Sequence, residues 1–236
     1  MASAVVIGVG PEAGLGAALA RRFAREGLDV LVAGRSQDKL DAVVAAIRAE
    51  GGTAGAAVLD ASDEPAVTAL FAGLAPELVV FNVGGNLARP ALDIDGATFE
   101  RLWRQNALAG FLVGREAVRA LLPQGRGTLL FTGATASLKA RPPFTAFASA
   151  KAALRAVAQG LAREFGPQGI HVAHVVIDGV IGGDYARDNF PDFVRHKGED
   201  GLLALDDIAD AYWALHRQRP SAWTHELDLR PFKEGF

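Results

Sequence analysis

Residues 4–16 read AVVIGVGPEAGLG, and this stretch decides the fold. Its first half, Ala4 to Val9, is an apolar run typical of a buried strand, and its second half is a glycine-rich turn. An Ala-rich segment with helical spacing follows and ends at Gly27, the residue type expected just past a helix. The order strand, glycine turn and helix is typical of a nucleotide site.

Glycines let the backbone turn sharply and approach a pyrophosphate, whose charge the free N–H groups of the helix can stabilise. We therefore expect Gly10, Gly14, Leu15 and Gly16 to bind the cofactor. The alternative is a tight turn without a ligand. The loop has no Lys-Ser or Lys-Thr pair, which argues against a P-loop.

Similar short apolar runs recur along the chain and alternate with segments of helical spacing. We predict further strands at 30–33, 56–59, 78–81, 128–132, 171–177 and 226–229. These runs are too uniformly apolar to have a wet face, so the sequence predicts an α/β fold: a doubly wound parallel sheet of about seven strands with helices on both faces. Residues 1–236 read as one Rossmann-type domain.

The composition narrows the function. With 24 Lys and Arg against 27 Asp and Glu, the chain has no basic excess for nucleic acid, so we expect a small-molecule substrate. The chain has no cysteine, and His171 and His174 lie three apart on a predicted strand and so point to opposite faces; no metal site is expected. Without a basic leader or a bilayer-length apolar run, a cytoplasmic protein away from the membrane is expected.

One long irregular region, residues 182–205, contains Gly182-Gly183, Pro191 and mixed charges. It follows the sixth predicted strand, near the carboxyl ends where α/β proteins bind ligands. We interpret it as a mobile substrate flap.

The spacing Gly-x-x-x-Gly-x-Gly resembles the glycine loop of the short-chain dehydrogenase/reductase family, and the resemblance covers roughly residues 4–229. It implies an adenine contact at Asp60, a turn after the fourth strand at Asn82 and Gly84, an active-site asparagine at Asn106 and a ribose-binding lysine at Lys151. It also implies a homodimer or homotetramer, for which the apolar row from Leu154 to Phe165 offers a surface.

The choice of cofactor depends on the end of the second predicted strand. An acid there accepts the ribose 2′-OH of NAD, whereas a basic residue accommodates the 2′-phosphate of NADP. Here the strand ends with Arg35 and Ser36, so we expect NADP rather than NAD, with these two residues as phosphate contacts. The alternative is that Arg35 is a solvated turn residue.

The sequence departs from the family where the chemistry occurs. Family members use a Tyr to transfer a proton and a Ser to bind the substrate oxygen, but the matching positions here are Phe147 and Ala134. Asn106 and Lys151 are what is left of the usual tetrad. Tyr185, in the flap, is a candidate to supply the missing phenol hydroxyl; the alternative is that its ring only packs the flap in place. Thr135 is a second candidate for the missing hydroxyl.

A positioned general acid contributes roughly 10² to 10⁴ in rate and one oxyanion donor roughly 10² to 10³, so simple ketone reduction should be very slow. Family members that reduce C=C bonds can dispense with the Tyr. We therefore predict an atypical NADP-dependent oxidoreductase that acts on activated C=C rather than simple C=O substrates. The alternative is a catalytically silent NADP-binding sensor or a structural partner of an active relative.

Overall fold

The computed structural model describes residues 3–198 and 200–235, so the predictions for the first two residues and for Glu199 in the flap lie outside the described residues. A seven-stranded sheet runs through the molecule with the order β3-β2-β1-β4-β5-β6-β7, and each neighbouring pair is parallel. The strands are β1 Ala4–Ile7, β2 Val30–Gly34, β3 Ala54–Val58, β4 Leu78–Phe81, β5 Gly127–Thr132, β6 Ile170–Ile177 and β7 Glu226–Leu229. The predicted doubly wound α/β fold is confirmed.

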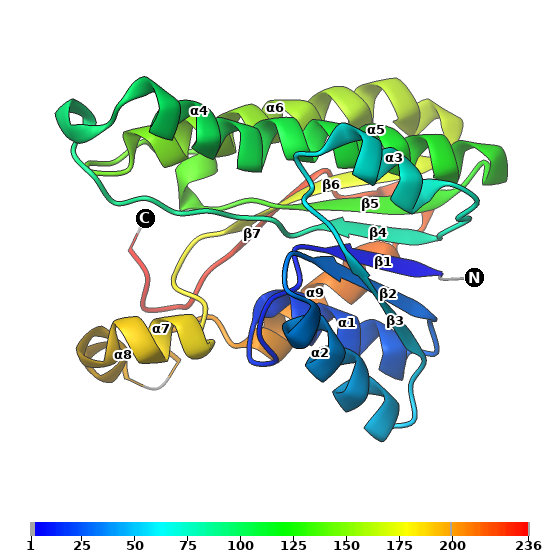
Figure 1. Ribbon diagram of the computed structural model, residues 1–236, viewed down its shortest axis with the longest axis horizontal. Helices are drawn as coiled ribbons and strands as arrows, with labels where there is room; N and C mark the ends of the chain where they lie inside the picture. The colour runs from blue at the N-terminus through cyan, green and yellow to red at the C-terminus, as the bar shows by residue number, and fades with distance from the viewer. Residues whose placement is uncertain (1–2, 199, 236) are drawn as a thin grey trace.

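Helices cover both faces of the sheet (Figure 1). One face is covered by α1 Leu15–Arg25, α2 Gln37–Ala49 and α9 Leu205–His216, and the other by α3 Glu64–Phe71, α5 Ala109–Leu121 and α6 Thr145–Phe165, with α4 Gly96–Trp103 against α6. Alternate residues of β1 enter two separate cores, since Val6 packs under α1 and Ile7 on the α5 side. Period-two alternation in a strand produces this division.

Strand β1 ends two residues earlier than predicted. Gly8 has φ +96°, a left-handed conformation that side chains rarely adopt, and this conformation takes the chain out of the sheet after Ile7. Strand β3 is likewise shifted, beginning at Ala54 rather than Ala56. The other predicted strands agree with the structure to within one residue.

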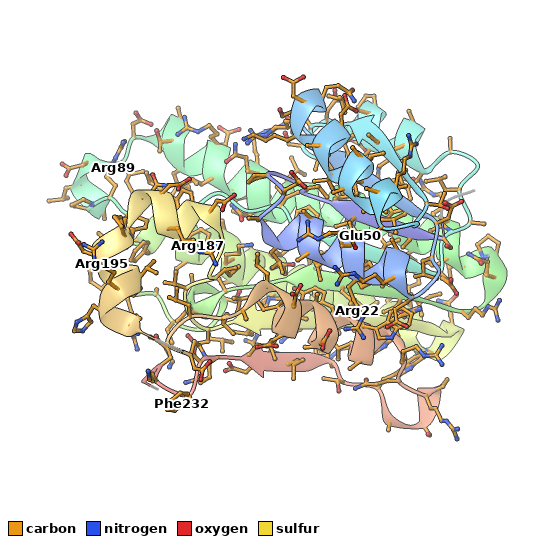
Figure 2. The ribbon with its side chains drawn as sticks, turned by 90° about the horizontal axis from the view of Figure 1, so that it is seen from below. Arg22, Glu50, Arg89, Arg187, Arg195 and Phe232 are labelled. Atoms are coloured by element: carbon orange, nitrogen blue, oxygen red, sulfur yellow. The ribbon has the colours of Figure 1, made fainter. Side chains whose placement is uncertain are left out.

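The region 182–205 is not the irregular segment that we predicted. It contains two short helices, α7 Asp184–Asn189 and α8 Pro191–Lys197, and a bridge between Ile181 and Leu203 closes its base. Pro191 occupies the first turn of α8, where the missing N–H and fixed φ of proline favour a helix. Figure 2 shows the segment from below, with Arg187 and Arg195 labelled on it.

The apolar row on α6 does not form a free surface for assembly. Leu154 and Leu161 are buried in the core on the α5 side, and Val157 and Phe165 pack against that core. A helix that covers a sheet must turn its apolar face toward that sheet. The apolar row of α6 therefore contributes to the core of the single chain. Separately, no helix among the described residues is long and apolar enough to cross a bilayer.

Candidate functional site

The candidate site lies where the strand order reverses. β1 and β4 are neighbours, yet β2 and β3 follow β1 on one side and β5 to β7 follow β4 on the other. In open α/β sheets, ligands bind beyond the carboxyl ends of the strands at such a point. The glycine loop after β1 and Asn82 after β4 meet here, because the Asn82 side-chain amide donates a hydrogen bond to the Gly8 carbonyl oxygen at 3.1 Å.

The loop is packed so closely that two of its glycines cannot carry a side chain. A Cβ at Gly8 would lie 2.6 Å from the carbonyl carbon of Asn82, and a Cβ at Gly16 would lie 2.9 Å from both the Gly8 oxygen and the Val9 Cα. A Cβ at Gly10, in contrast, would meet no atom within 4 Å. The loop is therefore held tightly on its protein side and is open at Gly10.

Helix α1 begins at the end of this loop. Gly14 is its N-cap, and because glycine has no side chain, the N–H groups of the first turn are left for another acceptor. A pyrophosphate fits this cradle of backbone N–H groups and glycines. Gly10, Gly14, Leu15 and Gly16 thus lie together where a dinucleotide would bind.

Arg35 and Ser36 follow β2 beside the same loop. A Cβ at Gly34 would lie 2.3 Å from the Val9 oxygen, so the end of β2 touches the turn. Ser36 is the N-cap of α2, and Arg35 is exposed. The arrangement leaves the guanidinium accessible to a ligand.

Asp60 lies two residues past β3, at the neighbouring strand end. Hydrogen bonds from the backbone N–H and the hydroxyl of Ser62 lower the pKa of its carboxyl group, and the positive charge of Arg35 lowers it further. The structure therefore brings the predicted adenosine-side residues Arg35 and Asp60 close enough to interact electrostatically.

Lys151 connects the ends of β4 and β5. Its Nζ donates to the carbonyl oxygens of Thr132 at 3.0 Å and Val83 at 3.4 Å, and a Cβ at Gly84 would lie 3.9 Å from it. Only 4% of the lysine is exposed. Burial lowers the pKa of its ammonium group to about 8. An ammonium has three N–H donors, so one is left for a ligand.

Asn106 lies in a π-helical turn, Arg104–Leu108, that interrupts the helix between α4 and α5. Its Nδ2 donates to the Leu102 carbonyl oxygen at 2.9 Å. Its Oδ1 is buried and has no hydrogen-bond donor within the described part of the chain. A buried acceptor of this kind calls for a ligand or water, and π-helical turns are frequent at functional sites.

Phe147 lies beside this lysine, and Ala134 follows the strand whose last residue, Thr132, accepts a hydrogen bond from it. The Phe147 ring, one helical turn before Lys151 on α6, has its centroid 6.0 Å from Nζ. Ala134 follows β5, two residues past Thr132, and its N–H donates to the Ser137 hydroxyl at 3.1 Å. Both side chains are hydrocarbons, and the Phe147 ring is the one in contact with the lysine.

Tyr185 lies on α7, and 68% of it is exposed. Its ring packs against Phe190 with centroids 6.0 Å apart. The base of its segment does reach the glycine loop, since the Asp184 N–H donates to the Ala13 oxygen at 3.2 Å. This contact with Phe190 agrees with the alternative that Tyr185 packs the flap. A catalytic role for Tyr185 stays a prediction.

Sequence reasoning missed one cluster at this edge. Thr135 donates a 2.6 Å hydrogen bond to Asp178, which follows β6, and Asp178 also forms an ion pair with Arg230, which follows β7. Arg230 bonds Asp228 at 2.9 Å as well. The Gly8 contact with Asn82 was missed too, although a glycine directly after a strand signals a left-handed residue.

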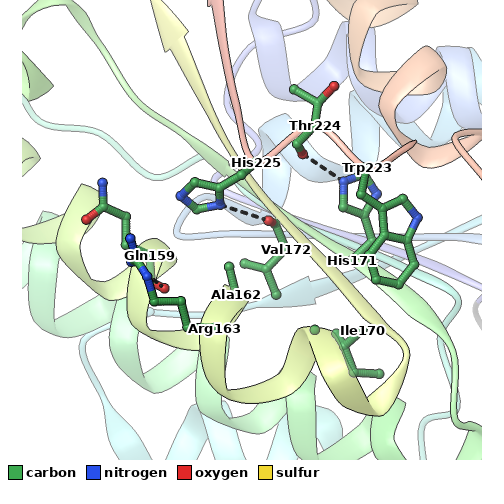
Figure 3. A pocket seen from close by; sticks show the side chains of 10 residues that line it. Gln159, Ala162, Arg163, Ile170, His171, Val172, Trp223, Thr224 and His225 are labelled. Carbon is green, nitrogen blue, oxygen red and sulfur yellow. Dashed lines mark hydrogen bonds between the residues drawn. The ribbon is translucent and has the colours of Figure 1, made fainter. Parts of the chain in front are cut away.

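A cavity of about 300 Å³ lies at the opposite, amino-terminal end of β6, between α6 and the segment before β7 (Figure 3). His171 stacks on Trp223 there, with centroids 4.9 Å apart. Because it opens away from the carboxyl ends of the strands, it is separate from the candidate site. The described residues contain no group of three or more His, Cys, Asp or Glu side chains that could hold a metal ion.

Comparison with known proteins agrees with this geometry. Residues 4–191 match the profile of the family described as short chain dehydrogenase. The crystal structure of a short-chain dehydrogenase from Rhodopseudomonas palustris is 41% identical, covers 97% of this chain and 98% of that one, and has a TM-score of 0.82.

Two further relatives differ in what their names report. Gluconate 5-dehydrogenase of Gluconobacter oxydans (strain 621H) is 28% identical over 225 residues, which are 93% of this chain and 82% of the relative. A metagenomic short-chain oxidoreductase, solved in complex with NADP, is 24% identical, covers 99% of each chain and has a TM-score of 0.82; at this identity it shows the shared fold.

Proposed function

Since the chain belongs to the short-chain dehydrogenase family, we propose that it is an NADP-dependent oxidoreductase whose site lacks the family's Ser and Tyr hydroxyls. One observation carries the proposal: Lys151 is buried between the ends of β4 and β5, with the Phe147 ring as its neighbour, and the end of β4 is in turn bonded to the glycine loop through Asn82. The residues proposed to hold a dinucleotide therefore lie at the edge of the sheet where a phenyl group stands in place of the family's usual proton donor.

The cofactor preference rests on Arg35. Its guanidinium is exposed next to the glycine loop, and no acid occupies the end of β2, so a 2′-phosphate would gain a charge-assisted contact there. The structural relative solved with NADP has the same fold. NADP is therefore the proposed cofactor, and NADPH supplies a hydride when bound.

An activated C=C bond is the proposed substrate class. In this reaction the β-carbon takes up the hydride and the α-carbon takes up a proton, so no hydroxyl has to protonate a developing alkoxide. Lys151 can hold that proton, because with a pKa of about 8 its amine is charged at pH 7. Phe147 is partly exposed, and its ring centroid lies 6.0 Å from Nζ, so it presents an apolar surface to the same region.

The test is a panel of substrates assayed by NADPH absorbance: 2-cyclohexen-1-one, cyclohexanone and, in the reverse direction with NADP⁺, D-gluconate. We expect turnover of the enone and almost none of the other two. Efficient reduction of cyclohexanone by the unmodified protein would overturn the proposed consequence of the missing hydroxyls. NADPH binding without turnover on a broad enone panel would instead favour the silent binding protein.

A double replacement, Ala134→Ser with Phe147→Tyr, tests the same idea from the opposite direction. It should raise cyclohexanone reduction by at least about 10²-fold, the lower value for a single positioned group. Each single replacement is the matched control and should gain less, because such groups act together.

A further inference from the structure

The cluster that joins β5, β6 and β7 has no assigned task in the proposed reaction. Thr135 Oγ1 lies 2.6 Å from Asp178 Oδ1, and Arg230 pairs with the other oxygen of the same carboxylate. Asp178 is 5% exposed, whereas Thr135 is partly exposed. The carboxylate therefore stays inside the protein and the hydroxyl forms the outer end of the chain of bonds.

The pairing fixes what Thr135 can offer a ligand. A hydroxyl has one proton and two lone pairs, and an ionised carboxylate can only accept. Asp178 accepts from the Thr135 hydroxyl through one carboxylate oxygen and from Arg230 through the other, so the Thr135 proton is committed to Asp178. What remains at the exposed side of Thr135 Oγ1 is a hydrogen-bond acceptor.

The location puts this acceptor beside the reacting region. Thr135 is next to Ala134 and three residues past Thr132, whose carbonyl oxygen binds Lys151 at 3.0 Å. Asp178 is likewise the first residue after β6, at the same carboxyl edge of the sheet. A ligand that reaches Lys151 thus lies within range of the short turn that carries Thr135.

We infer that Thr135, held by Asp178 and Arg230, is a specificity-determining acceptor that selects substrates carrying a hydroxyl or N–H donor near the reacting carbon. The inference rests on the proposed function only for the position of the substrate. It narrows the proposed class to activated alkenes that also carry a hydroxyl or N–H donor near the reacting carbon.

Asp178→Asn makes the inference testable, because it reverses the direction of the hydrogen bond. The new amide can donate to Thr135 Oγ1, which frees the hydroxyl proton to donate to a ligand. The acceptor site becomes a donor site while the shape is retained. Such a bond is worth roughly 2- to 10-fold in affinity.

The experiment measures ligand-observed NMR affinities for cyclohexanol, which can donate, and cyclohexanone, which can only accept. The protein is saturated with whichever of NADP⁺ and NAD⁺ binds more tightly in titration. We expect the unmodified protein and Thr135→Ser to bind the alcohol about 2- to 10-fold better than the ketone. In Asp178→Asn this preference should invert, and in Thr135→Val it should vanish.

Ser137→Ala is the matched control, since it removes a buried hydroxyl from the same turn and should leave the preference unchanged. An equal preference in the unmodified protein and in folded Asp178→Asn would overturn the inference. The readout needs no turnover. A protein that reduces no enone but shows the inversion would therefore refute the proposed reaction and keep the inference.

Discussion

Lys151 should make the stability of this protein depend on pH in an unusual range. The residue is 4% exposed, and burial lowers the pKa of its ammonium group from 10.5 to about 8. Between these two values the unfolded chain binds a proton at this position and the folded chain does not. The free energy of unfolding should therefore rise with pH across this window, and the cost of burying the charge is fully present below pH 8.

The size of the effect follows from the two pKa values. Linkage gives an increase of about 2 to 3 kcal/mol between pH 7 and pH 10 from this residue. Lys151→Met removes that increase. It also leaves the carbonyl oxygens of Val83 and Thr132 without their donor, a loss of about 1 kcal/mol each that does not vary with pH. The pH dependence of the difference, rather than its sign at any one pH, is the diagnostic quantity.

The assay is urea unfolding of the unmodified protein and Lys151→Met at pH 7, 8, 9 and 10, followed by circular dichroism. Contributions of other groups cancel in the difference, including Tyr212, whose phenol has a pKa raised by burial. Lys39→Met, which replaces an exposed lysine on α2, is the matched control. Two profiles that stay parallel within about 0.5 kcal/mol would refute the buried-ammonium reasoning.

Two other predictions concern the exposed Arg35 at the candidate site and the histidines His174 and His216. Arg35→Glu should weaken NADPH binding by roughly 10- to 100-fold and reverse the preference over NADH, measured by fluorescence titration; equal curves for the two cofactors in the unmodified protein would contradict the assignment. Burial lowers the pKa of both His174 and His216 to about 4, so the unfolded chain binds more protons between pH 6.5 and 4 and stability should fall as the pH drops through that window, by up to about 3 kcal/mol per imidazole. In His216→Gln, the free energy of unfolding measured with urea should fall less steeply between pH 6.5 and pH 4. An unchanged dependence on pH would show that His216 does not contribute to this fall.

The fold could be predicted because its determinants are local. The run from Ala4 to Val9 and the glycines after it combine a strand period with a turn signal, and repetition of this pattern leaves little besides a doubly wound sheet. The prediction was wrong where a residue type is compatible with two kinds of local structure. Pro191 is read equally well as a loop residue or as the first residue of a helix, and the structure has the helix.

The candidate site also has features that local sequence predicts and features that depend on the tertiary structure. Phe147 and Lys151 are four residues apart on a helix, so their proximity follows from helical geometry alone. The burial of Lys151 does not, because it depends on two carbonyl groups that follow different strands. Helical spacing alone is also consistent with a lysine whose aliphatic stem lies along the apolar row and whose ammonium group reaches solvent.

Arg230 shows why the remaining part of the site was out of reach. It lies 52 residues from Asp178, and the two meet because β7 is hydrogen-bonded beside β6 in one register, with Ile177 opposite Leu229. A shift of one residue would turn Arg230 to the other face of the sheet. The orientation of the Thr135 hydroxyl depends in turn on that arginine, because the carboxylate that accepts the hydroxyl proton is the one that Arg230 holds. Whether Thr135 offers a substrate a donor or an acceptor therefore depends on how β7 is aligned with β6. The residues near Thr135 in the sequence do not reveal that alignment.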